Sequence, residues 1–499
     1  MSPFSKKSQK VENVDYIKSY AVNAMALNRL KTCIQTLTKV LTIFVGVSIV
    51  ANASAKANDS KPNIILMYAD DLGWMDLGCQ GSDYYETPHL DKLAADGIRF
   101  TNAYAAASNC APSRASLMTG QYPARHGVYT VDTSLRGASK DRRLIPTPNT
   151  EFIKDEHLTL AEVLKDNGYT TGHFGKWHIT KDPTQDGFDL NIGGNSAGGP
   201  YTGGYHSPYR YPNCSSNEPG EYLTDRMGSE AIKFIEENKE TPFFIYFSTY
   251  SVHGPWQAKK EYVEKFKAKQ PSKAHNDPVY AGMLQSLDEN IGRLLAKIDE
   301  LDLSDNTLIV FTSDNGGVYR RTKQWPLRAG KGSYFEGGIR EPFIARWIGK
   351  IEPGKICDVP VSQIDLFPTF LEAVGIEVPK GKLLDGVSIM PLLTQSGDID
   401  NRALFWHFPI YLQKGNGETR DRSFRARPGS AVRYGDWKLH EDFETGNLEL
   451  YNLKDDISEK NDLSEKMPEQ VAELHTKLKS WRSQLDAPVP TELNPEYKP

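Results

Sequence analysis

Short apolar runs alternate with amphipathic segments along most of the chain, beginning at Pro62. The apolar runs include NIILMY at 63–68, PFFIYFSTY at 242–250 and NTLIVFTSDN at 306–315, and LTLAEVLKDNGY at 158–169 continues the alternation. Continuous apolar runs of this length are typical of strands that are buried on both faces of a sheet. The pattern therefore predicts an α/β fold with a large, mostly parallel central sheet flanked by helices. In such folds, ligands bind beyond the carboxyl ends of the strands.

Two further segments stand out before residue 385. Apolar residues recur at helical spacing over 280–301, which predicts a helix whose simplest role is to cover the sheet. Glycines alternate with four tyrosines over 191–213, and this composition predicts a loop.

The pattern changes after LDGVSIMPLL at 384–393. Short strand-like pieces at 430–440 and 447–453 precede an amphipathic helix near 467–485, which indicates a smaller antiparallel α+β unit. We therefore predict two structural domains, an N-terminal catalytic domain over 60–385 and a C-terminal α+β subdomain over 386–499.

The N-terminal segment has the pattern of an export signal. Arg29, Lys31 and Lys39 precede about twelve apolar residues at 40–51, and small residues follow at 53–55. A membrane anchor is the alternative, but this run is shorter than the roughly 20 residues that span a bilayer. We predict a signal peptide over 1–55, with Met25 as an alternative start, and a periplasmic or secreted bacterial protein without a stable membrane span.

Charge and cysteine content narrow the function classes. The 499 residues carry a net charge of −5 and no long block of one sign, so we expect no nucleic-acid partner. An anionic substrate must therefore be met by a local basic pocket. Cys33 is expected to be removed with the signal peptide. The spacing of the other four cysteines is not that of a metal site, and the sequence has no CxxC motif. The sequence leaves the pairing of Cys79, Cys214 and Cys357 open.

Acidic residues follow two of the predicted strands. Asp70 and Asp71 end the first apolar run, and Asp314 and Asn315 end the run at 306–315. Carboxylate and amide oxygens suit a hard cation such as Ca²⁺ or Mg²⁺ better than zinc. Each pair alone is also an ordinary turn former, so this pattern does not by itself separate a metal site from a turn.

The stretch NCAPSRASLMTG at 109–120 places Cys110 at the start of a predicted helix, with Pro112 in its first turn. Backbone N–H groups at a helix N-terminus favour anions, and Arg114 lies on the same helical face as Cys110. A buried structural cysteine is the common alternative.

CAPSRASLMTG resembles the signature of type I sulfatases, in which the cysteine of CxPSR is oxidised to Cα-formylglycine (3-oxoalanine). Further segments resemble sulfatases in family order over roughly 60–465: YADDLGWMDLGCQG, TPHLDKLAADGIRF, TLAEVLKDNGYTTGHFGKWH, TSDNGG, RAGKGSYFEGGIREP and LYNLKDDISEKNDL. The resemblance implies an alkaline-phosphatase-like fold. It also implies that a formylglycine-generating enzyme or an anaerobic sulfatase-maturating enzyme acts on Cys110 during biogenesis.

The resemblance also implies the site residues. It makes one Ca²⁺ ion the cofactor, with these ligands: Asp70, Asp71, Asp314, Asn315 and the modified Cys110. It makes the catalytic set Cys110, Arg114, Lys176, His178, His253 and Lys331. A hydrated formylglycine offers a hydroxyl that attacks sulfur. His178 is then the expected general base, and His253 is the expected general acid that protonates the leaving sugar oxygen. Arg114, Lys176 and Lys331 are expected to neutralise the charge of the sulfate oxygens.

Further polar residues are candidates for substrate contact. His206 and His407 are each expected in a loop flanked by aromatic residues, which is typical of sugar sites. Arg320 and Arg321 lie between the metal-ligand motif and Lys331, where they could bind a second sulfate or carboxylate, or be solvated. The remaining candidates are expected to be structural or exposed: His89, His126, His157 and His173.

The leading hypothesis is thus an exported sulfuric ester hydrolase that releases sulfate from a sulfated carbohydrate. A phosphonate or phosphate ester hydrolase of the same fold is the alternative within enzymes. If Cys110 remains a thiol, the third hypothesis is a non-catalytic protein that binds sulfated glycans.

Overall fold

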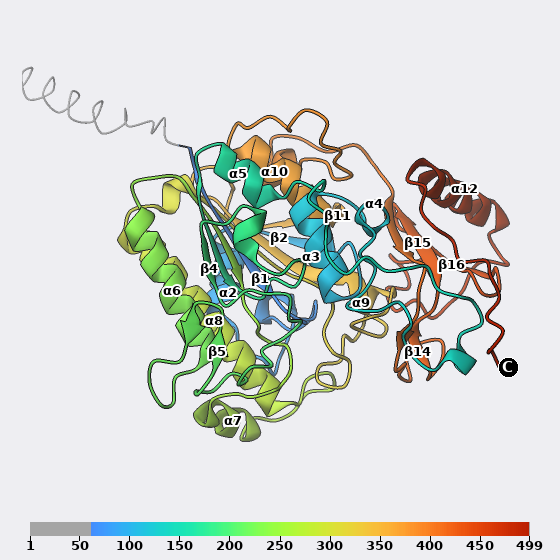
Figure 1. Cartoon of the computed structure of the whole chain (residues 1–499), viewed down its shortest axis with the longest axis horizontal. Helices are drawn as coiled ribbons and strands as arrows, with labels where there is room; N and C mark the ends of the chain where they lie inside the picture. Colours follow the sequence, from blue (N-terminus) through green and yellow to red (C-terminus); the bar gives the residue numbers. More distant parts are fainter. Residues whose placement is uncertain (1–60, 499) are drawn as a thin grey trace, which may run out of the picture. The chain divides into compact units, whose positions relative to one another are not determined.

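A nine-stranded sheet forms the centre of the computed structural model, which describes residues 61–498 (Figure 1). Eight strands lie in this order: β10 (Lys355–Cys357), β2 (Ile98–Tyr104), β9 (Arg340–Arg346), β8 (Thr307–Ser313), β1 (Asn63–Ala69), β7 (Phe243–Ser248), β3 (Thr170–Gly175) and β4 (Leu190–Ile192). The ninth, β11 (Val361–Ser362), pairs with β2. All neighbours are parallel except β9, which is antiparallel to β2 and β8. The predicted mostly parallel sheet is confirmed.

Alternate residues of β1 point into two different cores. Ile65 and Met67 pack in the core that contains residues of α2 (Pro88–Ala95), α6 (Leu223–Asn238) and α8 (Pro278–Glu300). Ile64 and Leu66 pack on the other face, with residues of α3 (Cys110–Thr119), α5 (Leu160–Asp166) and α10 (Leu366–Ala373). The strand is apolar at every position because both faces of the sheet are covered.

Helix α8 matches the helix predicted over 280–301. It begins where the Asp277 side chain accepts hydrogen bonds from the backbone N–H groups of Val279 and Tyr280, at 2.9 and 3.1 Å. Its apolar face, which includes Leu284, Leu287 and Ile291, is buried in the core under the sheet. The predicted covering role is therefore confirmed.

A second sheet of four antiparallel strands follows in the chain. Its order is β12 (Leu404–Phe408), β15 (Gly429–Tyr434), β16 (Trp437–Asp442) and β17 (Leu448–Asn452). Helix α12 (Pro468–Gln484) packs Leu474, Leu478 and Trp481 against Val432 and Leu439 of this sheet. The predicted C-terminal α+β architecture is confirmed, although the boundary at residues 385–386 stays a prediction.

The remaining elements are short. The other α-helices are α4 (Pro123–His126), α7 (Lys260–Lys267), α9 (Glu336–Ile339) and α11 (Met390–Leu393). Two small hairpins are formed by β5 (Arg210–Tyr211) with β6 (Cys214–Ser215) and by β13 (Leu412–Gln413) with β14 (Phe424–Ala426). Single turns of 3-10 helix occur at Gly78–Gln80, Ser139–Asp141, Pro183–Asp186, Ser304–Asn306 and Gln363–Asp365.

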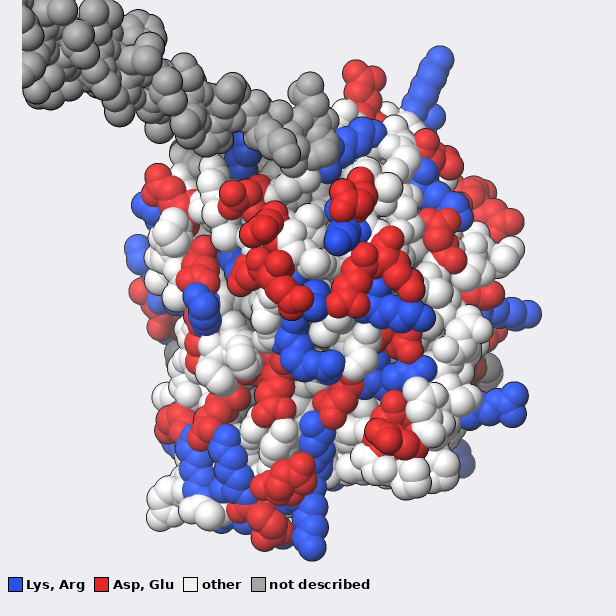
Figure 2. Space-filling model, turned by 90° about the vertical axis from the view of Figure 1, so that its left-hand side faces the viewer, with Lys and Arg blue, Asp and Glu red and all other residues white. Residues whose placement is uncertain are grey.

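Three other predictions concern the whole chain. The signal peptide predicted over 1–55 lies outside the described residues. Within 61–498, no helix is both long and apolar enough to cross a bilayer. No disulfide joins any of the four described cysteines: Cys79, Cys110, Cys214 and Cys357. On the face shown in Figure 2, Lys and Arg side chains are intermixed with Asp and Glu.

Candidate active site

The carboxyl ends of four adjacent strands bring the predicted site residues together. Strands β8, β1, β7 and β3 are neighbours and parallel, so their ends meet at one edge of the sheet. Asp314 follows β8, Asp70 and Asp71 follow β1, His253 follows β7, and Lys176 follows β3. Ligand sites at this edge are expected for an open α/β sheet, and here the edge collects acidic and basic groups at once.

Cys110 is the first residue of α3 and lies among these charged groups. Lys331 Nζ donates a hydrogen bond to Cys110 Sγ at 3.0 Å, and Sγ lies 3.6 Å from Asp70 Oδ1 and 3.9 Å from Asp71 Oδ1. Burial raises the pKa of the Cys110 thiol to about 12, against the opposing effect of Lys176 and Lys331. An unmodified Cys110 would stay protonated at neutral pH and would be a poor nucleophile.

Six charged side chains, which we call the inner charge cluster, surround Cys110: Asp70, Asp71, Asp314, Arg114, Lys176 and Lys331. Lys176 Nζ lies 2.8 Å from Asp70 Oδ2, and Arg114 Nη2 lies 2.8 Å from Asp314 Oδ2. Lys331 pairs with Asp71. Each cation is therefore matched by a carboxylate, and the cluster has no formal net charge.

The oxygen atoms of this cluster fit a hard cation. Side-chain ligand atoms of Asp70, Asp71, Cys110 and His253 lie within 4.8 Å of one another. Asn315 Oδ1 is buried without a hydrogen-bond partner, so an acceptor is available beside the carboxylates. Three carboxylates and an amide oxygen are the donor set of Ca²⁺. His253, which was not predicted as a ligand, belongs to the same group of atoms.

Asp71 and His178 both adopt left-handed backbone conformations, with φ of 64° and 72°. Such conformations cost residues other than glycine about 1–2 kcal/mol. The backbone N–H of Asp71 donates to Asp314 Oδ1 at 3.0 Å, and that of His178 donates to the Asn195 carbonyl at 2.9 Å. These bonds hold both side chains at the site despite the local cost.

The two histidines of the site have low proton affinity. Burial, with help from Lys176, lowers the pKa of His178 well below 6.5, and its Nδ1 has no hydrogen-bond partner. Burial lowers the pKa of His253 to about 3, although Asp71 acts in the opposite direction. His253 Nδ1 lies 2.6 Å from the Gly254 carbonyl and therefore carries the proton of the neutral ring. Its Nε2 lies 3.7 Å from Asp71 Oδ2.

The glycines of the predicted loop let its backbone approach these histidines. A Cβ atom on Gly198 would lie 2.8 Å from His178 Nε2, and one on Gly199 would lie 3.0 Å from His253 Nδ1. Tyr201, from the same loop, packs its ring edge-on to His253 with centroids 6.3 Å apart. Larger residues at positions 198 and 199 would push the loop away from the site.

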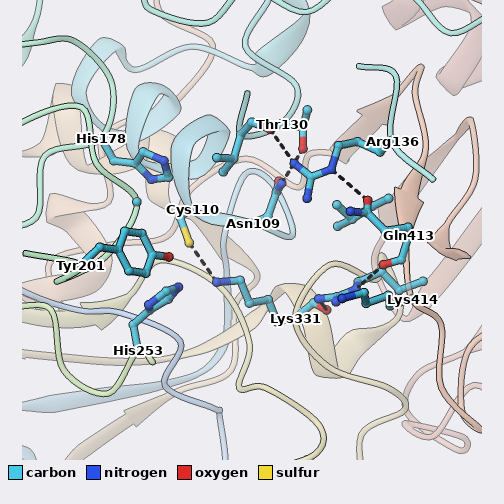
Figure 3. Close-up of a pocket in the computed structure, with 14 residues that line it drawn as sticks. Asn109, Cys110, Thr130, Arg136, His178, Tyr201, His253, Lys331, Gln413 and Lys414 are labelled. Atoms are coloured by element: carbon cyan, nitrogen blue, oxygen red, sulfur yellow. Dashed lines mark hydrogen bonds between the residues drawn. The ribbon is translucent and has the colours of Figure 1, made fainter. Parts of the chain in front are cut away.

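A cavity of about 260 Å³ opens above Cys110 and is lined by His178, Tyr201, His253 and Lys331. Figure 3 shows His178, Tyr201 and His253 on one side of the cavity, Arg136, Gln413 and Lys414 on the other, and Lys331 reaching between them toward Cys110. A larger cavity of about 910 Å³ shares Tyr201, His253 and Lys331 with the first, so the two lie next to each other. Substrate atoms that enter the smaller cavity come close to the Cys110 side chain.

Arg114 and Lys176 do not line either cavity. Both side chains are fully buried and are held by Asp314 and Asp70. Of the three cations expected to neutralise sulfate oxygens, only Lys331 is in the cavity wall. Arg114 and Lys176 therefore lie on the side of the Asp314 and Asp70 carboxylates that faces away from the cavity.

Two of the substrate-contact predictions are not supported by the positions of the residues. His407 is not in a loop but on strand β12, where it is 2% exposed. Its Nδ1 lies 2.8 Å from Ser430 Oγ and its Nε2 lies 2.9 Å from the Pro488 carbonyl. The predicted loop at His407 is therefore wrong, because the aromatic residues around it are packing partners in a sheet, and its substrate contact stays a prediction.

His206 is the second substrate-contact prediction that its position does not support. It lines neither cavity, and its Nε2 lies 3.2 Å from the Ala258 carbonyl. Arg320 lines the larger cavity, whereas Arg321 pairs with Asp277 at 2.8 Å and does not line it. Of these three residues, only Arg320 is positioned to meet a substrate.

The residues that line the cavities and were not predicted as site residues include Arg136, Tyr201, Lys414 and Arg425. Tyr201 belongs to the glycine- and tyrosine-rich loop, so the composition of that loop carried a signal. The other three follow no motif and come from segments far apart in the sequence. Only the folded chain brings them together.

Comparisons with known proteins agree with this geometry. A family model described as "Sulfatase" matches residues 62–376, and one described as "N-sulphoglucosamine sulphohydrolase, C-terminal" matches 330–484. A "Sulfatase" of Formosa agariphila is 31% identical, with 88% of this chain and 92% of that protein covered. The "N-acetylgalactosamine-6-sulfatase" of Homo sapiens is 33% identical, with coverage of 69% and 68%. The crystal structure of Ps i-CgsB in complex with k-i-k-neocarrahexaose is 30% identical, with a TM-score of 0.72 and coverage of 87% and 95%.

Proposed function

The chain belongs to the sulfatase family and is a sulfuric ester hydrolase, and we propose that its substrate is a sulfated carbohydrate. The observation that carries this proposal is the position of Cys110, within CAPSR, between Lys331 and the carboxylates of Asp70 and Asp71. The names of two relatives support the substrate class, since one is an N-acetylgalactosamine-6-sulfatase and the other binds a neocarrahexaose.

We further propose that Cys110 is converted to Cα-formylglycine and that Asp70, Asp71, Asp314 and Asn315 hold one Ca²⁺ ion. When present, formylglycine supplies a hydroxyl of its hydrated aldehyde as the nucleophile, and the ion supplies positive charge beside it. The buried, unpartnered Oδ1 of Asn315 and the neighbouring carboxylates of Asp70 and Asp71 support the choice of a hard cation.

The chain's own residues then divide the remaining tasks. Lys331 Nζ, in the cavity wall, binds a sulfate oxygen and stabilises the negative charge that develops there. Arg114 and Lys176 are positioning residues, because they hold Asp314 and Asp70 in place from behind.

The two histidines move protons. His178 is neutral at physiological pH, since its pKa is well below 6.5, and a ring nitrogen can therefore accept a proton as general base. His253 donates a proton from Nε2 to the departing sugar oxygen. It must first acquire that proton, because its pKa is about 3, and the negative charge of a bound sulfate favours this step.

Export and maturation complete the proposal. A signal peptide over 1–55 would direct the chain to the periplasm or the exterior of a bacterium, where polymeric sulfated carbohydrates are accessible. A formylglycine-generating or anaerobic sulfatase-maturating enzyme would modify Cys110 within CAPSR. The domain boundary at 385–386 would separate the catalytic domain from the subdomain that supplies Lys414 and Arg425 to the cavity wall.

The test is release of inorganic sulfate from a panel of sulfated monosaccharides and oligosaccharides with defined sulfate positions. The protein is produced together with a maturation enzyme, and matched phosphate and phosphonate esters form a second panel. We expect kcat/KM for the best sulfate ester to exceed that for its matched phosphonate ester. Preference for the phosphonate would establish the alternative hydrolase, and binding without turnover of any ester would establish the glycan-binding protein.

A further inference from the structure

Four positively charged side chains in the cavity walls have no carboxylate partner in the described residues. We call them the rim cations: Arg136, Arg320, Lys414 and Arg425. Arg425 donates only to backbone carbonyls, from Nε to Gln413 at 3.1 Å and from Nη1 to Lys331 at 3.3 Å. The Lys414 side chain is exposed. No carboxylate of residues 61–498 forms an ion pair with any of the four.

The other two rim cations are held in place without charge compensation. Arg136 donates from Nε to Gln413 Oε1 at 2.9 Å and from Nη1 to the Val131 carbonyl at 2.8 Å. Arg320 lies over the ring of Trp256, with Cζ 4.7 Å from the ring centroid. Neutral acceptors and an aromatic face orient a guanidinium but leave its charge available to an anion.

The rim cations are arranged along both cavities. Arg136 lines the smaller cavity beside Cys110, and Arg320 lines the larger one. Arg425 and Lys414 line both, so they lie where the cavities adjoin. Burial lowers the pKa of Arg425, and repulsion from Arg136 and Arg320 acts in the same direction, whereas Asp71 acts in the opposite direction. An anion placed among these groups would relieve that repulsion.

The cavities leave space for more than the sugar that carries the reacting sulfate. The larger one, at about 910 Å³, is near the upper end of the roughly 300–1,000 Å³ of typical ligand pockets. Its walls include Trp256 and Tyr201, and aromatic faces are suited to sugar rings. The scissile sulfate near Cys110 is already served by Lys331, which leaves the rim cations for another part of the substrate.

We propose that the rim cations form a second anion-binding subsite, which recognises a sulfate ester or carboxylate on the saccharide next to the sugar that is desulfated. This inference rests on the proposed function and specifies its substrate as an oligosaccharide with at least two negative charges. Arg425 and Lys414 are the central residues of the subsite, and Arg136 and Arg320 extend it at either end.

The test compares substrates that share one scissile sulfate. One oligosaccharide carries no other charge, a second carries another sulfate on the neighbouring sugar, and a third carries a uronic acid there. The variants are Lys414→Gln, Arg425→Gln and Arg425→Lys. Lys479→Gln, on the exposed side of α12, removes one positive charge away from the cavities and serves as the matched control.

We expect the wild type to prefer a doubly charged oligosaccharide over the singly charged one. Lys414→Gln should lower this preference about three- to fivefold, the range of an exposed ion pair. Arg425→Gln should lower it about tenfold or more, since its partly buried guanidinium makes stronger charged hydrogen bonds, and Arg425→Lys should restore part of it. Added salt should reduce the preference of the wild type more than that of either glutamine variant. Lys479→Gln should leave the preference unchanged.

A second measurement separates this inference from the proposed function. The Cys110→Ala protein cannot turn over substrate, so calorimetry reports its affinity for the three oligosaccharides alone. Tighter binding of a doubly charged oligosaccharide, weakened by adding Lys414→Gln, supports the subsite even if no sulfate is ever released. Sulfate release without any preference for a second charge, in the wild type and the variants alike, overturns the subsite and leaves the proposed function intact. The tighter-binding doubly charged oligosaccharide identifies the second group as sulfate or carboxylate.

Discussion

The inner charge cluster surrounds Cys110 and the rim cations line the adjoining cavities, but within residues 61–498 only the first set is paired with carboxylates. In the inner charge cluster, three cations face three carboxylates at the ends of the central strands. The rim cations come from loops and a short hairpin, and they contact carbonyls, an amide or an aromatic ring. A fully buried charge is costly unless a group of the chain pairs with it. A charge at a cavity wall remains solvated, so it can stay unpaired until a ligand binds.

The difference teaches how this site separates chemistry from recognition. The inner charge cluster is fixed before substrate arrives, as expected for groups that stabilise a transition state. The rim cations can form ion pairs only when a negatively charged ligand binds, as expected for groups that select a substrate. Substitutions in the first group should therefore affect every sulfate ester, and substitutions in the second should affect only some.

The largest effect is expected for Cys110→Ala, which removes the group at the centre of the inner charge cluster. Sulfate release should fall on the order of 10⁴-fold or more for all substrates, as for the loss of a catalytic nucleophile. Sulfate release is measured by ion chromatography, and thermal unfolding checks that the protein is folded. Residual activity within tenfold of the wild type would mean that Cys110 does not supply the nucleophile.

Removal of the metal should have the next largest effect. Treatment with a calcium chelator should lower kcat about a hundredfold or more, because the ion supplies several kcal/mol of charge stabilisation. Added Ca²⁺ should restore the activity. Asp71→Asn should give a similar loss that Ca²⁺ does not restore. Full activity after exhaustive chelation, with no metal detected in the protein, would contradict the calcium site.

Arg114→Gln tests whether the inner charge cluster contributes more to the stability of the fold than the rim cations do. It leaves the carboxylate of Asp314 buried without its partner, so we expect a loss of about 3–5 kcal/mol in the free energy of unfolding. Arg320→Gln, at the exposed rim, should change this free energy by no more than about 0.5 kcal/mol. Urea unfolding followed by fluorescence measures both. Equal destabilisation by the two variants would remove the distinction between the two regions.

The smallest effect concerns His407, which lies in neither region. Burial lowers its pKa to about 3, so between that value and about 6.5 the unfolded chain binds a proton that the folded chain does not. His407 therefore makes the protein less stable as the pH falls through this window, by at most about 1.4 kcal/mol per pH unit. His407→Gln should have a shallower pH dependence of unfolding there, with kcat/KM unchanged. A change in kcat/KM alone would support the substrate-contact prediction for His407.

The sequence predicted the inner charge cluster because its residues follow strands or belong to a motif. A short apolar run predicts a buried strand, and the polar residue directly after the run then lies at the carboxyl edge of the sheet. Asp70 and Asp314 were located in this way, whereas Lys176 was implied by the resemblance to sulfatases, and the structure brings the three together. The N-terminal position of Cys110 in α3 followed from the proline two residues later.

The rim cations could not be predicted because no local pattern distinguishes them. A lone arginine in a loop has the same sequence pattern whether it faces solvent or a cavity, and the contact between Arg425 and Lys331 spans 94 residues. His407 shows the reverse error, since its aromatic neighbours indicated a sugar-binding loop but alternate along a buried strand. Which loops meet over Cys110 is decided by tertiary packing alone.

The central claim is that Cys110 is no longer a thiol in the functional protein. Mass spectrometry of the tryptic peptide 100–114, from protein isolated from its native host, tests it most directly. We predict a peptide that is lighter than the cysteine form, because an aldehyde oxygen replaces the sulfur and two hydrogens are lost. An intact thiol at position 110 in fully active protein would contradict the account.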